Sequence, residues 1–142
     1  MFNFFKKKKS SDEQNNVFVF SSDDAVIEAY KQKAQSEIQY LIDFMDANER
    51  NEELFRYAVK ARFKEAEKAE HMWIQVDDFK DGYFLGRLAN KPDTVKSVQY
   101  GDHVTIPRTD VEDWILEDFL TGTKVGHFSM TYLRGPGNTD KN

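Results

Sequence analysis

A single apolar stripe along residues 23–47 constrains the fold of this chain more than any other feature. The stripe recurs at intervals of three or four residues and consists of Val26, Tyr30, Ala34, Ile38, Leu41 and Met45. This spacing places the side chains on one face of an α-helix. Ser22 is positioned to act as its N-cap, with Asp23 and Asp24 in the first turn, where negative charge suits the helix dipole. The sequence therefore predicts one long amphipathic helix, from Asp23 to about Ala47, that needs a second layer to cover it.

Most of the chain after this helix has the alternation and turn residues of a sheet. The predicted strands are residues 55–64, 70–79, 83–90, 103–108, 111–119 and 124–134. Asp81-Gly82 predicts a tight turn between two of them, and the mid-strand Gly86 indicates a bulge, a bend or a close backbone approach. Pro107 cannot donate to a ladder, so its strand is an edge strand or ends there. The segment KEAEKAE is expected to be a charged connection, and VFVF at 17–20 a short strand or an apolar arm.

These elements predict an α+β fold, in which one long N-terminal amphipathic helix packs on a strongly curved antiparallel sheet of five or six short strands. The length of 142 residues suggests a single domain, which we expect at 17–134 between disordered tails at 1–16 and 135–142. The first tail is rich in lysine, and a weak membrane anchor at residues 1–11 is the alternative to disorder. We do not expect that membrane contact, because one short aromatic cluster anchors weakly.

Charge and cysteine content narrow the function. The net charge is −5, and because residues 1–11 carry four lysines and no acid, the rest of the chain carries −9. Nucleic-acid binding needs a basic footprint, so no nucleic-acid partner is expected. The absence of cysteine fits a reducing compartment. We therefore expect a cytoplasmic protein, with a peripheral position on the inner face of the membrane as the alternative.

The segment EHMWIQVDDF, residues 70–79, indicates which surface could be functional. In a strand, Met72, Ile74 and Val76 share one face and should meet Ile38, Leu41 and Met45 of the helix. The other face carries a histidine and a tryptophan. The candidate binding surface consists of His71, Trp73, Asn90, Asp102 and Trp114.

Trp73 allows two interpretations. In the first, sheet curvature buries it in a second cluster with Trp114, and truncation to alanine should cost about 3–5 kcal/mol. In the second, its indole edge is exposed in a shallow groove bordered by His71, Asn90 and Asp102, where tryptophan is favoured for binding. We favour the buried cluster with a polar rim. Turn chemistry accounts for Asn90 and Asp102 themselves, and Asp113 is expected to cap a loop.

No catalytic, cofactor-binding or metal-ligating residue is assigned. The three histidines, His71, His103 and His127, lie on separate predicted strands without the spacing of a zinc motif. Neighbouring acids such as Glu112 and Asp113 should point to opposite faces of a strand, so they are not expected to form a catalytic pair. A phosphate-binding glycine loop and a G-x-S-x-G nucleophile elbow are both absent from the sequence.

The order of several short motifs resembles the YegJ-like family of bacterial domains (domain of unknown function 2314). The resemblance runs from about Val17 to Arg134, and its most specific pieces are Glu70-His71-x-Trp73, Gly86-x-Leu88-x-Asn90-x-Pro92, Gly101-Asp102-x-Val104 and Asp113-Trp114. The chain differs in having KEAEKAE where a glycine-containing turn is common, and a lysine-rich start where some relatives have an export signal. The resemblance implies a small stand-alone or appended domain and no established activity.

Two functional hypotheses follow. The first is a non-enzymatic protein-binding or regulatory module, a class that includes immunity proteins that neutralise a toxin. The missing catalytic constellation and the aromatic residues on a polar face favour it. The second is a small-molecule-binding domain, or a hydrolase with an unrecognised site, which would need an apolar pocket with a few convergent polar groups. The identity of a partner and the oligomeric state are left open.

Overall fold

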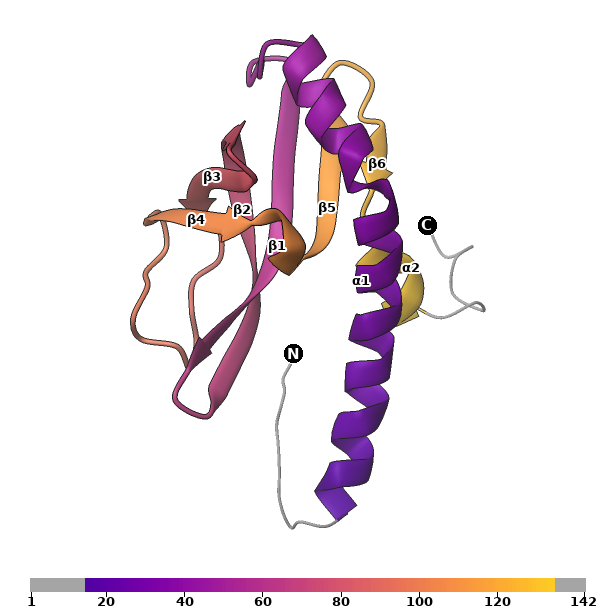
Figure 1. Ribbon diagram of the computed structural model, residues 1–142, viewed down its shortest axis with the longest axis vertical. Helices are drawn as coiled ribbons and strands as arrows, with labels where there is room; N and C mark the ends of the chain where they lie inside the picture. Colours follow the sequence, from indigo (N-terminus) through magenta and orange to yellow (C-terminus); the bar gives the residue numbers. More distant parts are fainter. Residues whose placement is uncertain (1–14, 135–142) are drawn as a thin grey trace.

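The computed structural model describes residues 15–134, with side chains described for 24–131. A long helix, α1 (Asn15–Ala47), lies beside a six-stranded antiparallel sheet with the order β4-β3-β2-β1-β5-β6 (Figure 1). The strands are β1 (Phe55–Glu65), β2 (Lys68–Lys80), β3 (Tyr83–Leu88), β4 (His103–Pro107), β5 (Val111–Asp118) and β6 (Lys124–Gly126). A single 3-10 turn, η1 (Arg108–Asp110), precedes β5, and a short helix, α2 (Phe128–Arg134), follows β6. The predicted fold class is confirmed.

The apolar stripe of α1 forms one side of the core. Tyr30, Ala34, Ile38, Leu41 and Met45 are at most 1% exposed, and Val26 is half-buried. The start of the helix was predicted wrongly, because α1 begins at Asn15 and includes the VFVF segment. Extending a helix costs less than nucleating it, and no glycine or proline interrupts residues 15–23. Of the expected tails, residues 1–14 and 135–142 lie outside the described part of the chain.

The first two strands are longer than expected. The KEAEKAE segment is not a separate connection, since β1 and β2 form a hairpin that turns at Ala66 and Glu67. Ala66 has a φ of 56°, and Glu65 pairs with Lys68 directly across the turn. Opposite charges that face each other across an antiparallel pair are stabilising, which suits this segment to a hairpin. The predicted Asp81-Gly82 turn is confirmed, with φ values of 54° and 86°.

The sheet curves where β2 meets β3. The pairing register shifts between Val76 and Asp78, and a Cβ added to Gly86 would lie 2.0 Å from the carbonyl oxygen of Gln75. Gly86 therefore marks a close backbone approach, one of the three predicted alternatives. Beyond this point β3 and β4 run across the direction of β1 and β5 (Figure 1). The edge strand β4 ends at Pro107, as expected.

The core lies between α1 and one face of the sheet. Met72, Ile74 and Val76 are buried in the same core cluster as Ile38, Leu41 and Met45, which confirms the predicted core face of β2, while β5 is the strand that packs most extensively against α1. Trp114 and Leu116 of β5 belong to the same cluster. Among the residues that the structure describes, no helix has the length and apolar character needed to cross a lipid bilayer.

The predicted last strand, residues 124–134, is correct only as far as Gly126. His127 has a φ of 59°, which ends the extended backbone, and α2 starts at the next residue. The Asp113 carboxylate accepts hydrogen bonds from the backbone N–H groups of Phe128 and Ser129, both at 2.8 Å. A carboxylate in this position satisfies N–H groups that the first turn of a helix leaves unpaired. Asp113 therefore caps the start of a helix, whereas the sequence had predicted that it caps a loop.

Candidate functional site

The side of the sheet opposite the core residues Val59, Ile74 and Trp114 carries a row of polar and aromatic side chains. Trp73 pairs with Lys60, which pairs in turn with Asp113, and each of the three alternates with core residues of its own strand. The three side chains are therefore neighbours on the second face of the sheet. We call this side the polar face; its residues on β1 to β5 include Lys60, Arg62, His71, Trp73, Arg87, His103 and Asp113.

Lys60 lies at the centre of this row. Its amine donates a hydrogen bond to the hydroxyl of Tyr30 at 3.4 Å, and it lies 5.4 Å from the Tyr30 ring centre and 5.8 Å from the Trp73 ring centre. Burial lowers the pKa of the Lys60 amine, while the carboxylates of Glu112 and Asp113 act in the opposite direction. The amine is thus held between two aromatic rings and two carboxylates.

A bulge in β5 brings both carboxylates to this place. The register against β1 shifts between Lys60, which pairs with Asp113, and Ala61, which pairs with Val111, so Glu112 is an extra residue. Both acids are buried, and burial raises the pKa of Tyr30 with a further contribution from each of them. The expectation that neighbouring acids face opposite sides is therefore wrong for this pair, because a bulge interrupts the alternation.

Each of the two acids has its own partners. A Glu112 oxygen lies 2.7 Å from Nδ1 of His71, and the Asp113 carboxylate accepts three backbone N–H groups, from Trp114, Phe128 and Ser129, at 2.8 Å each. Asp113 thereby joins β5 to α2 at the edge of the row.

His127 completes the row, and sequence reasoning missed it. Its ring meets Trp73 edge-on at 5.8 Å between centres, and its backbone N–H donates to the Trp114 carbonyl at 2.7 Å. Burial lowers the pKa of His127; Asp113 opposes this effect, and nearby cations including Lys60 reinforce it. The Lys60–Trp73 cluster, as we name it, consists of Tyr30, Lys60, His71, Trp73, Glu112, Asp113 and His127.

The candidate surface inferred from sequence is only partly assembled. His71 and Trp73 both belong to the cluster, and the Asn90 side-chain oxygen accepts the Trp73 backbone N–H at 2.7 Å. Asp102 belongs to a turn, where its carboxylate accepts the backbone N–H of Gln99 at 2.9 Å, as turn chemistry predicted. Trp114 lies on the other face, fully buried, with its indole N–H donating to the Ala34 carbonyl at 3.1 Å.

The environment of Trp73 therefore differs from the expected one. Trp114 is not its neighbour, because Asp113 and Trp114 point to opposite faces of β5 and Asp113 takes the position beside Lys60. Trp73 is half-buried between Lys60 and His127. Trp73 thus combines features of the buried and the exposed interpretation, because part of its ring packs against neighbours and the rest is in contact with solvent.

The arrangement is suited to holding and presenting charge. Each acid of the cluster bonds an imidazole or backbone N–H groups, and the amine bonds a phenol. Within residues 15–134, no group of three or more histidine, aspartate or glutamate side chains could hold a metal ion. The cluster thus presents the half-buried indole of Trp73 beside charged groups that hydrogen bonds hold in place.

Comparison with known proteins identifies relatives of the chain. It is 32% identical over 69 residues to a protein named "Uncharacterized protein YegJ" of Escherichia coli (strain K12), covering 49% of this chain and 43% of that protein. It is 36% identical over 73 residues to a "Putative ankyrin repeat protein" of Neisseria meningitidis serogroup B, covering 51% of this chain and 28% of that protein. The chain thus spans less than half the length of either curated relative.

No solved structure matches the chain. A family model described as "Uncharacterized protein conserved in bacteria (DUF2314)" matches residues 23–141, a range that includes every residue of the Lys60–Trp73 cluster. With most of its length matched, the chain belongs to this family of conserved bacterial domains.

Proposed function

We propose that this domain is a protein-binding module whose polar face recognises an acidic segment of a partner protein. One observation carries the proposal. Arg62 and Arg87 are exposed on the polar face, and neither has an ion-pair partner among the described residues. Two buried acids of the same face are already engaged, since Glu112 bonds His71 and Asp113 bonds three backbone N–H groups.

The two arginines flank Trp73. Arg62 pairs with His71, two residues before Trp73 on β2, and Arg87 pairs with Gln75, two residues after it. Diagonal neighbours at this offset lie roughly 7–8 Å apart, within reach of long side chains. An acidic segment laid along β2 could therefore form ion pairs on both sides of the indole. Tryptophan and arginine are the residues most enriched among binding hot spots.

The net charge of the chain affects where an acidic segment can approach. The chain carries a net charge of −5, so the protein as a whole repels an acidic segment. A local cationic patch on an acidic body favours approach at that patch and disfavours it elsewhere. The half-buried Trp73 would supply apolar contact area at the centre, where water is excluded on binding.

Charge reversal tests the proposal. We would immobilise the full chain and expose it to a nuclease-treated lysate of its native host. The test variant is Arg62→Glu with Arg87→Glu, and the matched control is Lys91→Glu with Lys96→Glu, which also reverses two exposed cations but lies off the polar face. The expected result is a protein captured by wild type and control, lost from the test variant and released by salt.

Purified partner and domain would then be measured directly. We expect the arginine variant to bind at least about tenfold more weakly than the wild type, as loss of about 1.4 kcal/mol implies. Circular dichroism would show that both variants remain folded. A set of captured proteins identical for wild type and the arginine variant would refute the proposal.

A further inference from the structure

The segment that joins β3 to β4, residues 89–102, contains no helix or strand. Connections of this length without regular structure are uncommon in compact domains and usually functional. This one is tied down at many points. The Glu70 carboxylate accepts the backbone N–H groups of Asp93, Thr94 and Val95 at 2.7, 3.0 and 2.9 Å. A Glu65 oxygen accepts the N–H of Lys96.

The ends of the segment are fixed as well. The Trp73 carbonyl accepts the Ala89 N–H at 2.8 Å, and the Leu88 carbonyl accepts the Gly101 N–H at 2.8 Å. Desolvation would raise the pKa of Glu70, but the four hydrogen bonds from residues 93–95 lower it overall, so this anchor stays ionised. The segment is therefore a preorganised loop, and preorganised loops lose little entropy when they bind a ligand.

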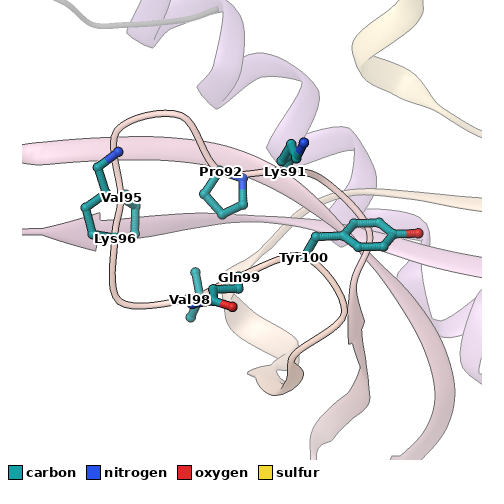
Figure 2. A pocket seen from close by; sticks show the side chains of 7 residues that line it. All are labelled: Lys91, Pro92, Val95, Lys96, Val98, Gln99 and Tyr100. Carbon is teal, nitrogen blue, oxygen red and sulfur yellow. The ribbon is translucent and has the colours of Figure 1, made fainter.

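The loop borders an open hollow of about 380 Å³, which Figure 2 shows from close by. Its lining consists of Lys91, Pro92, Val95, Lys96, Val98, Gln99 and Tyr100. In Figure 2, Lys96 and Tyr100 lie on opposite sides of Pro92. The volume falls within the roughly 300–1,000 Å³ typical of sites for small molecules.

The lining combines two kinds of contact. Pro92, Val95 and Val98 contribute apolar surface, and Tyr100 adds an aromatic ring that is 68% exposed. Lys91 and Lys96 contribute two cations, and no carboxylate is part of the lining. The Lys96 amine is oriented by a hydrogen bond to the Asp93 carbonyl at 3.1 Å, which leaves two of its three N–H groups for a ligand.

Three acids around the loop bind its backbone, whereas Asp93, within the loop itself, is exposed. Glu65, Glu70 and Asp102 each accept backbone N–H groups of the loop. The carboxylates of Glu65, Glu70 and Asp102 thus hold the loop backbone, while Lys91 and Lys96 border the hollow.

We propose that this hollow is a binding site for a small organic anion, a carboxylate on a flat apolar body, with Lys91 binding the carboxylate, Tyr100 covering the apolar part and Lys96 adding a second positive charge on the other side of Pro92. The apolar surface argues against inorganic anions, which would leave the exposed parts of Pro92 and Val98 in contact with water. The site uses none of the side chains of the polar face, so the proposal does not depend on protein binding there.

The test is a titration of the full chain followed by amide chemical shifts. The probes are benzoate and indole-3-acetate, their uncharged amides, and inorganic phosphate. We expect saturable shifts for residues 91–100 with the carboxylates, and at least about tenfold weaker binding of the amides and of phosphate. Lys91→Met with Lys96→Met should weaken carboxylate binding about tenfold or more. Arg62→Glu with Arg87→Glu is the matched control and should leave it unchanged.

Three outcomes would overturn this inference. The first is the absence of saturable shifts in the loop up to about 10 mM carboxylate, a concentration that detects even millimolar affinity. The second is equal binding of carboxylates and amides, which would remove the role of the lysines. The third is phosphate binding as tight as that of indole-3-acetate, which would remove the role of the apolar surface. Because the arginine variant serves here as control, a failed protein-binding proposal would leave this result standing.

Discussion

Asp113→Asn changes one atom of the candidate site, and the structure allows its cost to be worked out. In the native protein one carboxylate oxygen accepts the N–H groups of Trp114 and Phe128, and the other accepts the N–H of Ser129, all at 2.8 Å. Asparagine has a single acceptor oxygen. Whichever way its amide is turned, an NH2 group then faces at least one backbone N–H, and that donor loses its partner.

The burial of Asp113 determines how much free energy of unfolding the substitution costs. Asp113 is 0% exposed and Ser129 is 4% exposed, so water does not replace the lost acceptor. A buried donor without a partner costs about 1–3 kcal/mol, and a hydrogen bond to a charged group contributes about 1.5–3 kcal/mol. These contributions overlap, so we expect a loss of about 2–4 kcal/mol in the free energy of unfolding. Because two of the three bonds cap α2, this helix should be affected first.

Urea unfolding with hydrogen exchange measures the effect. A loss of about 3 kcal/mol should lower the urea midpoint by about 1–2 M for a domain of this size. The amides of Phe128 and Ser129 should lose protection. Asp102→Asn is the matched control, because its exposed carboxylate accepts the Gln99 N–H in a turn, and its cost should stay within about 0.5 kcal/mol. Equal midpoints for the two variants would show that Asp113 does not hold α2 in place.

Three further predictions concern the polar face and the sheet. Gly86→Ala should cost about 3 kcal/mol in urea unfolding, because its Cβ would meet the Gln75 backbone at 2.0 Å; a midpoint equal to wild type would contradict the close approach. Trp73→Ala should cost about 2 kcal/mol and the fully buried Trp114→Ala about 3–5 kcal/mol, so equal losses would show that Trp73 is buried too. His127 resists protonation in the folded state, so stability should fall as pH drops below about 6.5, where the unfolded chain binds the extra proton. His127→Asn, which suits the positive φ, should flatten that dependence between pH 8 and 5, and parallel stability curves for the two proteins would refute it.

Sequence periodicity predicted the parts of the fold that depend on burial alone. The stripe from Tyr30 to Met45 and the alternation of Met72, Ile74 and Val76 place the core correctly, because a helix and a strand each have a fixed repeat and one face must be buried. Local turn chemistry was also sufficient at Asp81-Gly82 and at Asp102. These features are set by neighbouring residues, which a sequence displays directly.

The candidate site depends on features that interrupt those repeats. Glu112 joins Asp113 on one face only because the register of β5 shifts, and no local signal in VEDW announces a bulge. His127 reaches Trp73 only because the chain leaves β6 with a φ of 59° and enters a helix capped by Asp113, a residue far away in sequence. Because the strand alternation was extended through residues 124–134, His127 was predicted to lie in a strand. Both errors have one physical origin, in that a tertiary contact overrode the local period.

The spacing of the Glu70-His71-x-Trp73 motif now has a physical reason. Consecutive residues of β2 point to opposite faces, so Glu70 can hold the loop 93–95 while His71 bonds Glu112 on the polar face. Trp73 contributes to both sides at once: its ring packs against Lys60 and His127, while its backbone N–H and carbonyl bond Asn90 and Ala89 at the start of the loop. The polar face and the loop hollow are therefore joined through the backbone of a single residue.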